Sequence, residues 1–293
     1  KEYLRLFPSL NGSFNVRENL VLRGAHYHSI GRPNFNQYSG GLTLPDIESA
    51  PSASNRISVN NAGIKPWTAK STSARLEYYF AAVGQVSISG FVRDFRNFFG
   101  STATPATPAF LALYGLDPAV YDAYDVSTTQ NVPGRVRMEG VDAGYRQALT
   151  FLPAWARGIQ AFANVSTLRA RGDPAANFAG FAPLTANWGL SLARERVGLR
   201  LNWNFRGRLR QAQVAAARGI DPATYNWSSS RLYLNVAADL RVARGWTLFA
   251  NLRNVTSVYE DVEIAGPATP AAAQLRSRAD FGSLWSFGLR ATR

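Results

Sequence analysis

The two histidines of the sequence, His26 and His28, are separated by a single residue. Side chains two residues apart point to the same side of an extended strand, so both imidazoles can approach one metal ion or metal chelate. Leu20 and Leu22 continue the same row, the sequence has no cysteine, and no third ligand is close in sequence. We therefore expect no metal site and no cofactor, and interpret the pair as part of an interfacial strand face.

Three arginines, Arg206, Arg208 and Arg210, recur at the same two-residue spacing. Guanidinium groups bind carboxylates and phosphates through paired hydrogen bonds, so this row suits an anionic substrate or the phosphates of lipopolysaccharide. The alternative explanation, that these arginines are simply exposed to solvent where a strand runs into a loop, fits the spacing equally well. Nucleic acid is not an expected partner despite the net charge of +13, because most cations are single arginines inside alternating segments.

Aromatic side chains occur throughout the segments that are rich in Gly, Pro and Asn, which are predicted loops. A rigid ring offers wide contact at little conformational cost, so such rings suit stacking on sugars or on aromatic siderophores. Packing within the loops is the alternative explanation for each ring. The candidate ligand-binding aromatics are Phe35, Tyr38, Phe98, Phe99, Tyr114, Tyr121, Tyr225 and Trp227.

Sequence motifs of common enzyme classes are missing from the chain. It has no Gly-x-Ser-x-Gly motif, no Gly-rich phosphate loop with Lys, no His-Glu-x-x-His and no dinucleotide fingerprint. We therefore expect a protein that is not an enzyme.

The elements that must position these residues are β-strands. From Val197 to Arg206, apolar residues alternate without exception with Gly, Asn and Arg, which places the two classes on opposite faces of a strand. Many such segments have 10 or more residues, which suits a tilted strand that crosses a bilayer better than a strand of a soluble sheet. About eleven strands are predicted, at about 4–16, 20–29, 68–80, 86–96, 135–149, 159–169, 185–192, 197–206, 232–240, 246–256 and 279–291.

Short and long connections alternate along the chain. The short ones are predicted at 17–19, 81–84, 151–158, 194–196 and 243–245, and the long ones at about 30–66, 97–134, 170–183, 207–228 and 257–278. Outer-membrane barrels have short periplasmic turns and long extracellular loops, so this asymmetry favours an all-β, antiparallel transmembrane barrel. Composition does not divide residues 1–293 into domains, and no apolar run approaches the roughly 18 residues of a membrane-spanning helix.

Several segments, in the order of the chain, resemble TonB-dependent receptors. Residues 6–33, LFPSLNGSFNVRENLVLRGAHYHSIGRP, resemble the strand, tight turn and Leu-Arg strand that lead into an Arg-Pro loop in that family. Similar family segments are Ile-Lys-Pro-Trp at 64–67, Leu-Glu-Tyr-Tyr-Phe at 76–80, Arg-Asp-Phe at 93–95, Glu-Gly-Val-Asp at 139–142, Asn-Leu-Arg-Asn at 251–254 and the final strand from 281 to 289. The resemblance covers essentially the whole chain.

The resemblance implies that residues 1–293 are the C-terminal portion of a 22-stranded barrel in the bacterial outer membrane. It implies uptake of a large scarce nutrient, a siderophore or an oligosaccharide, by extracellular loops and by a plug on which TonB pulls. The implied partners are the missing N-terminal barrel half and plug, the TonB complex, outer-membrane lipid and lipopolysaccharide, and a small-molecule ligand. Two departures are the ending Ala-Thr-Arg in place of a terminal aromatic, which puts the assembly signal in doubt, and the lack of a plug or TonB box.

The strand faces opposite the apolar rows mix both signs of charge, which predicts a polar barrel interior. These side chains are expected to contact a plug or a substrate path, or to hydrate and cross-link the lumen. They are Arg23, Arg75, Glu77, Arg93, Glu139, Asp142, Arg200, Asn202, Asn204, Asp239 and Arg253.

Two other interpretations remain open from the sequence. A complete barrel of about twelve strands, with an additional hairpin within 30–66, would act as a passive porin or an adhesion platform. A secreted soluble β-protein that binds glycans would need a second sheet to cover its apolar strand faces.

Overall fold

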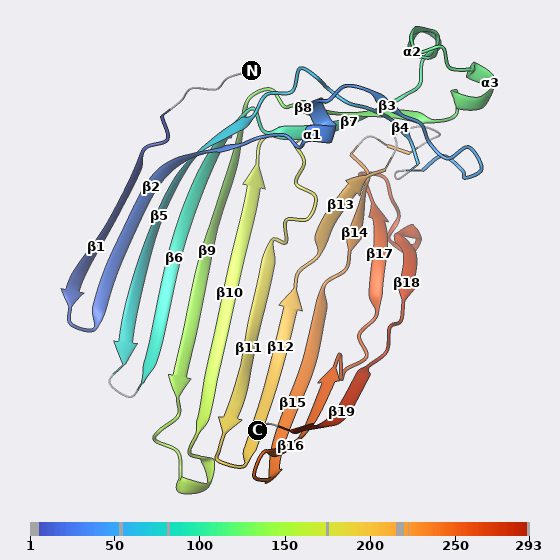
Figure 1. The fold of residues 1–293 in the computed structure, drawn as a ribbon. Coiled ribbons are helices and arrows are strands. Elements are labelled where there is room, and N and C mark those ends of the chain that lie inside the picture. The colour runs from blue at the N-terminus through green and yellow to red at the C-terminus, as the bar shows by residue number, and fades with distance from the viewer. Residues whose placement is uncertain are drawn as a thin grey trace.

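A computed structural model of the chain describes residues 6–52, 55–80, 83–173, 176–214, 220–221 and 223–291. Eleven long strands form one antiparallel sheet that curves through the molecule, as Figure 1 shows. The strands are β1 (Ser9–Arg17), β2 (Leu20–Gly31), β5 (Trp67–Phe80), β6 (Gly84–Arg96), β9 (Arg135–Ala148), β10 (Ile159–Arg171), β11 (Leu184–Ala193), β12 (Val197–Arg206), β15 (Arg231–Ala243), β16 (Trp246–Arg253) and β19 (Leu284–Ala291). The predicted all-β sheet of eleven antiparallel strands is therefore confirmed. Residues 4 and 5, where the first strand was expected to begin, lie outside the described residues.

The long strands pair in the order in which they follow one another along the chain, from β1 at one edge to β19 at the other. In the described part of the chain these two edge strands do not pair with each other, so the sheet is not closed. The segment 30–66, where a twelve-stranded barrel would need an additional hairpin, contributes β3 (Leu42–Thr43) and β4 (Ile57–Val59) to a different sheet. The eleven-stranded sheet therefore gives no support to a complete small barrel.

The pairing register divides the long sheet into two faces, because residues directly opposite each other on neighbouring strands share a face. On one face, Trp188 lies opposite Trp203 and Leu190 opposite Leu201. We call this face, which also carries Leu76, the outer face. Exposed large apolar side chains cover it, among them Leu22, Leu76, Ile88, Leu190, Leu199, Leu232, Leu240, Leu248, Trp285, Phe287 and Leu289.

The opposite face, the inner face, is the one over which the long loops fold. Ala69, Phe95 and Met138 belong to it by register, and they are buried in one hydrophobic cluster with the loop residue Phe98. Loop residue Phe178 packs against the same cluster. Away from this apolar base, the inner face carries many polar and charged side chains, as alternation predicted, among them Arg75, Glu77, Asn202 and Asn204.

The long connections are more ordered than the sequence suggested, because they build two small sheets of four strands each beyond one end of the long strands (Figure 1). The first contains β3, β4, β7 (Phe99–Pro105) and β8 (Asp125–Asn131), and the second contains β13 (Leu209–Gln213), β14 (Tyr225–Ser228), β17 (Glu260–Ala265) and β18 (Leu275–Ala279). Short helical segments are α1 (Phe35–Tyr38), α2 (Pro108–Leu113), α3 (Pro118–Tyr121), η1 (Ala154–Ala156) and η2 (Ala271–Ala273). None of the helices within the described residues is long and apolar enough to cross a membrane.

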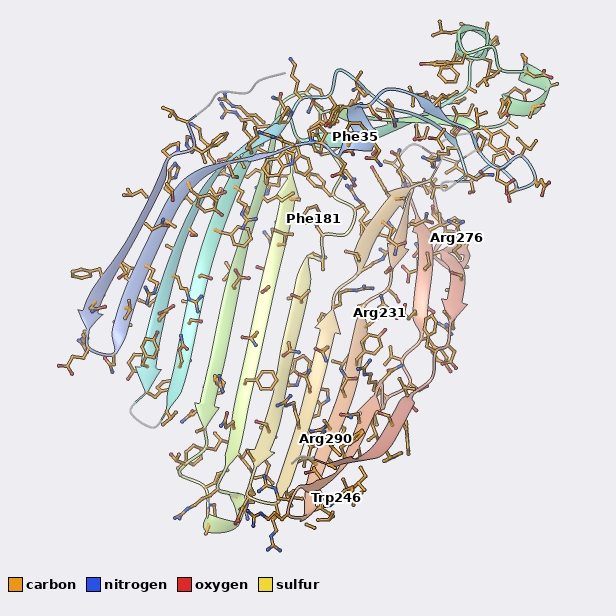
Figure 2. The ribbon with its side chains drawn as sticks, viewed as in Figure 1. Phe35, Phe181, Arg231, Trp246, Arg276 and Arg290 are labelled. Atoms are coloured by element: carbon orange, nitrogen blue, oxygen red, sulfur yellow. The ribbon has the colours of Figure 1, made fainter. Side chains whose placement is uncertain are left out.

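The described residues of the short connections lie at the opposite end of the sheet from the two small sheets. Figure 2 shows Trp246 and Arg290 at this short-turn end, whereas Arg231 lies toward the loop end. Trp246 is the first residue of β16, next to the short connection between β15 and β16, and is half-exposed. The asymmetry between short and long connections is therefore a spatial asymmetry between the two ends of the sheet.

On the inner face, three phenylalanines each lie directly opposite a glycine of the neighbouring strand. Phe91 lies opposite Gly140, Phe162 opposite Gly189 and Phe249 opposite Gly288. In each pair the ring lies over the glycine, where a Cβ atom would come within 3 Å of ring carbons. The missing Cβ atom of the glycine therefore leaves room for the ring to pack against the curved sheet. The ring in turn covers the backbone at the glycine.

We expect Gly189→Ala to destabilise the folded sheet by about 1–3 kcal/mol, because overpacking forces the ring and backbone to move. The new Cβ would meet Phe162 at 2.9 Å and also the carbonyl oxygen of Leu201. Gly24→Ala in β2 is the matched control, since its Cβ would have no atom within 4 Å. Resistance of the detergent-solubilised protein to heat unfolding, followed by gel mobility, measures the difference. Equal stability of the two variants would contradict this account of the glycines.

Candidate functional site

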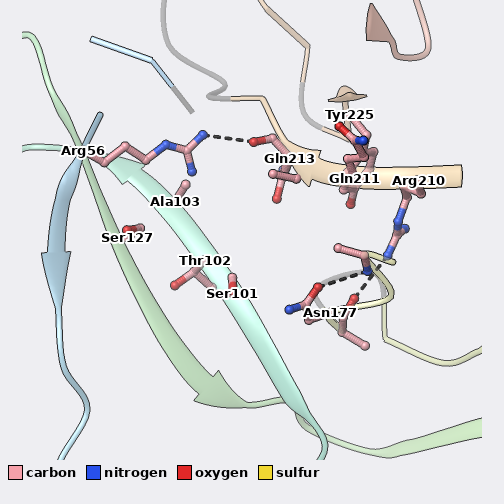
Figure 3. A pocket seen from close by; sticks show the side chains of 13 residues that line it. Arg56, Ser101, Thr102, Ala103, Ser127, Asn177, Arg210, Gln211, Gln213 and Tyr225 are labelled. Carbon is pink, nitrogen blue, oxygen red and sulfur yellow. Dashed lines mark hydrogen bonds between the residues drawn. The ribbon is translucent and has the colours of Figure 1, made fainter. Parts of the chain in front are cut away.

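The two small sheets and the segment 176–179 line an open cavity of about 260 Å³ at the loop end of the molecule (Figure 3). Its walls come from segments that lie far apart in the sequence. The polar and aromatic lining residues are Arg56, Ser101, Thr102, Ser127, Asn177, Arg210, Gln211, Gln213 and Tyr225, with Ala103, Ala176, Ala179 and Ala212 between them. Two arginines and no carboxylate are among the described residues that line the cavity, so this lining is cationic.

Arg56 joins the two sides of the cavity. Its Nη2 atom donates a hydrogen bond of 3.0 Å to the carbonyl oxygen of Gln213, and Nε donates to the carbonyl oxygen of Ser52 at 3.3 Å. Partial burial lowers the pKa of the Arg56 guanidinium, an effect that the nearby carboxylate of Asp125 opposes. The side chain remains a cation, because an arginine stays protonated at any physiological pH.

Arg210 is held by rings on two sides of its guanidinium. Its Cζ atom lies 4.5 Å from the centre of the Tyr225 ring and 5.3 Å from that of Phe178. Nη2 donates a hydrogen bond of 3.3 Å to the carbonyl oxygen of Ala176. Cation–π contacts fix the plane of the guanidinium while leaving its edge able to donate, so this arginine is well placed to bind an anionic oxygen in the cavity.

Of the aromatics proposed from the sequence, Tyr225 is the one that lines this cavity. Trp227 is two residues further along β14, and the guanidinium of Arg208 lies 4.6 Å from the centre of its ring. Its indole Nε1 is buried and has no hydrogen-bond acceptor among the described residues. Arg208 also forms an ion pair of 2.7 Å with Glu263, so this corner of the second small sheet is packed and charge-balanced.

The other proposed aromatics lie elsewhere in the loop region. Phe98 is buried in the hydrophobic cluster below the loops, and Phe99 begins β7. Phe35 and Tyr38 form an exposed edge-to-face pair in α1, with ring centres 5.4 Å apart. Tyr114 and Tyr121 contact Phe110 and Tyr124 in the helical part of the same loop region. These contacts account for several of the rings as loop packing.

Sequence reasoning did not single out Arg56, Asn177 or Phe178 for this site. Each is a lone residue in an irregular segment, and nothing in its spacing distinguishes it from neighbouring loop residues. The available signal was the row Arg206, Arg208 and Arg210, of which only Arg210 reaches the cavity.

The residues expected on the lumen side lie on the inner face with one exception. Glu77 accepts hydrogen bonds from Arg23 at 3.2 Å and from Tyr79 at 2.8 Å, and forms an ion pair of 2.9 Å with Arg75. Arg93 lies over the ring of Phe91 on the same face. By register the inner face also carries Asp142, Arg200, Asn202, Asn204, Asp239 and Arg253.

Glu139 is the exception, and its expected position toward the lumen is wrong. It lies opposite Val92 and Arg169 on the outer face, where its carboxylate forms an ion pair of 2.9 Å with Arg171. The physical reason is the period of the strand: residues 139 and 142 are an odd number of positions apart, so they cannot share a face.

The two histidines and Arg206 lie on opposite faces of the long sheet. His26 and His28 lie on the outer face, where Nδ1 of His26 is 2.9 Å from Oγ1 of Thr72. Arg206 lies on the inner face opposite Arg231, so it projects away from the outer face. Among the described residues, no group of three or more His, Asp or Glu side chains has a geometry that would hold a metal ion.

Beside Arg206, the side chains of Arg231, Tyr233 and Glu260 form a compact charged group below the second small sheet. The hydroxyl of Tyr233 donates a hydrogen bond of 2.7 Å to Glu260, and Arg231 forms an ion pair with the same carboxylate. These interactions, the hydrogen bond from Tyr233 first, lower the pKa of Glu260, which lies in β17 beyond the long strands. Two nitrogen atoms of Arg206 are buried here and have no acceptor among the described residues.

Residues 1–255 match the family described as TonB dependent receptor-like, beta-barrel. No curated protein matches the chain in sequence.

Among solved structures, a ferric enterobactin receptor from Pseudomonas aeruginosa is 17% identical with a TM-score of 0.66, covering 97% of this chain and 40% of that receptor. The siderophore receptor PirA from the same organism is 13% identical with a TM-score of 0.62, covering 98% and 42%. The copper transporter OprC is 16% identical with a TM-score of 0.63, covering 97% and 39%. The chain thus spans about 40% of the length of these proteins, and the likeness shows a common fold.

We expect the protection of the β17 backbone amides against hydrogen exchange to depend on pH, because Glu260 titrates. Because the folded state lowers the pKa of this carboxyl, its stabilising effect is complete above the ordinary glutamate pKa of roughly 4.3 and is lost as the pH falls below that value. Hydrogen exchange of residues 260–265 at neutral and acidic pH measures the effect. In Glu260→Gln and in Tyr233→Phe, the acid-induced loss of protection should be smaller than in the wild type. An unchanged pH profile in Glu260→Gln would assign the effect to another group.

Proposed function

This chain belongs to the TonB-dependent receptor-like β-barrel family, and we propose that it forms the C-terminal part of the barrel wall of a receptor that takes up a scarce nutrient. The observation that carries the proposal is the cationic cavity of Arg56 and Arg210 at the loop end of the sheet. Loops of distant sequence position converge on this cavity and stand at the mouth of a polar inner face. A ligand captured there would lie above the interior through which it must pass.

Proteins of this family are receptors of the bacterial outer membrane, and we propose the same location for this chain. Two features support it: the outer face presents many large apolar side chains to its surroundings, and the long strands suit a tilted crossing of the bilayer. The long loops would then be extracellular and the short turns periplasmic. No covalent chemistry is needed for this function.

The unpaired edges of β1 and β19 indicate that further strands must pair with this chain. In hydrocarbon, each unpaired backbone N–H or C=O group costs several kcal/mol, so both edges need neighbouring strands. We propose that the remaining strands of a larger barrel, 22 in all, supply them and that a plug fills the polar interior. TonB would act on that plug.

For the ligand, we propose an anionic ferric siderophore ahead of a neutral oligosaccharide. Arg56 and Arg210 supply two cations, and no carboxylate is among the lining residues that the structure describes. Hydrogen bonds between charged partners are about twice as strong as neutral ones. The ring of Tyr225 offers stacking surface beside Arg210. The resemblance in fold to a ferric enterobactin receptor and to the siderophore receptor PirA supports the same choice.

The size of the cavity limits what it holds. Its volume of about 260 Å³ is just below the roughly 300–1,000 Å³ of sites for whole small molecules. We therefore propose that it receives one anionic arm of a larger ligand, while the rest of the ligand extends over the inner face.

The double variant Arg56→Gln with Arg210→Gln should bind a ferric catecholate at least about tenfold more weakly, because each charge-assisted hydrogen bond contributes about 1.5–3 kcal/mol. The probes are ferric enterobactin, a ferric hydroxamate and maltohexaose, with the protein expressed from its native gene. Binding to outer-membrane vesicles and uptake of radioactive iron by starved cells are the measurements.

A matched control is Arg276→Gln with Arg278→Gln, which removes the same charge from β18, outside the cavity. We expect this control to bind like the wild type. Binding of maltohexaose without binding of either ferric chelate would overturn the choice of ligand, and equal binding by both double variants would remove the cavity from the proposal.

A further inference from the structure

An open hollow of about 640 Å³ lies on the outer face of β12, β15, β16 and β19, toward the short turns. Its floor contains Ala238 and Ala250, which are direct partners between β15 and β16. Larger apolar side chains on the same face surround this pair and also line the hollow: Leu192, Val197, Leu199, Leu240, Leu248 and Phe287. Two small residues among large ones thus leave a notch in the apolar surface.

The hollow has almost no polar side chain of its own. Asp239 is the one charged residue among its described lining residues, and by register its side chain belongs to the inner face, opposite Gly198 and Phe249. The outer surface of the hollow is therefore hydrocarbon, suited to an acyl chain or to another apolar side chain.

The hollow lies within one leaflet of a bilayer that the long strands would cross. Trp246, at the short-turn end in Figure 2, shares the outer face with Ala250 and precedes it by four residues on β16. At about 3.3 Å per residue and a tilt of about 40°, Ala250 is roughly 10 Å deeper than Trp246. Because tryptophan favours the membrane interface and one leaflet has about 15 Å of hydrocarbon, the hollow occupies the leaflet at the short-turn end.

Arginines border the hollow at its short-turn end. The backbone N–H of Arg241 donates a hydrogen bond of 2.8 Å to the carbonyl oxygen of Arg196, so the turn between β11 and β12 lies beside the end of β15. Arg244 is in the next turn, between β15 and β16. Arg196 and Arg244 are exposed, and neither forms an ion pair with a described residue. Together with Arg194, they give these two turns three cations against the single acid Glu195.

These two features together select a lipid over a protein. Within a bilayer, an apolar surface gains nothing from a protein partner that lipid tails do not already supply, so the hollow alone attracts no second protein. A two-fold contact with a second copy would also bring the same patch, with Arg196 and Arg244, against itself. A molecule with an acyl chain and a phosphate satisfies the hollow and the arginines at once.

We propose that this surface binds one anionic glycerophospholipid of the phosphatidylglycerol type. One acyl chain fills the notch over Ala238 and Ala250, and the phosphate accepts hydrogen bonds from Arg196 and Arg244. A headgroup without an amine is favoured, because the ammonium of phosphatidylethanolamine would be placed among arginines. The assignment rests on the proposed function, because the hollow faces the periplasmic leaflet only if the short turns are periplasmic.

The test of the hollow is the phospholipid that stays with the whole receptor, expressed from its native gene and extracted in mild detergent. The receptor is incubated with equal amounts of phosphatidylglycerol and phosphatidylethanolamine, and the retained lipid is measured by native mass spectrometry. The wild type should retain phosphatidylglycerol in preference. Ala238→Leu with Ala250→Leu fills the notch and should remove most of this retention. The matched control, Ala143→Leu with Ala186→Leu, enlarges two alanines elsewhere on the outer face and should behave like the wild type.

The arginines are tested by Arg196→Gln with Arg244→Gln. This variant should retain at least about tenfold less phosphatidylglycerol, because each arginine near an anionic headgroup contributes to binding. Arg17→Gln with Arg157→Gln removes the same charge from other short turns and should leave retention unchanged. Arg196→Lys with Arg244→Lys keeps the charge and should restore most of the retention, which separates loss of charge from poor assembly.

Equal retention of phosphatidylglycerol by the notch-filling variant and the wild type would overturn the proposal, and so would equal retention of the two lipids by the wild type. A dimer that is lost only in the notch-filling variant would assign the hollow to a second copy instead. Orientation is scored separately with Glu18→Cys in the turn between β1 and β2, since the chain has no cysteine. A membrane-impermeant maleimide should label this variant no more than the wild type in intact cells. Labelling would overturn the proposed orientation along with the lipid site, whereas absent lipid selectivity without labelling overturns the lipid site alone.

Discussion

Backbone hydrogen bonding between neighbouring strands is the interaction on which the rest of this structure depends. Nine of the eleven long strands pair with the long strand before them and with the one after them, and the pairing continues for as many as 13 residues between β5 and β6. In hydrocarbon such pairing is obligatory, because no water can replace a missing partner. The two edge strands, β1 and β19, show the limit of the arrangement, since each presents one row of backbone groups that the described sheet does not pair.

Once the strands are paired, the two-residue period fixes the chemistry of both faces at the same time. Arg75 and Glu77 meet on the inner face, and the intervening Leu76 points to the outer face. The same alternation places some charged residues on the outer face, as it does Glu139, which forms an ion pair with Arg171 there. A single strand can therefore place charged side chains on both faces of the sheet without any change of backbone conformation.

The loops add a second level of organisation that local pattern does not reveal. Arg56 contacts Gln213, which is 157 positions away, and Phe178 packs both on the hydrophobic cluster of Phe98 and beside Arg210. Such contacts arise because the long sheet brings the ends of its strands to one side, where their connections meet. The cavity at the loop end is consequently a product of the whole sheet and belongs to no single loop.

The sequence by itself determined the strands, their faces and the sorting of short and long connections, because side-chain alternation and turn composition are local properties. Leu201 and Asn202 lie on the faces that alternation assigned to them. What the tertiary structure decided was which distant residues meet. Arg210 meets Tyr225 and Phe178 at the cavity. Lys70, Arg96 and Arg135 meet at a second hollow of about 270 Å³ near the loop end of β5, β6 and β9. Those meetings depend on the register of several strands and on how loops fold over one end of the sheet, and neither quantity is encoded in the spacing of residues along one segment.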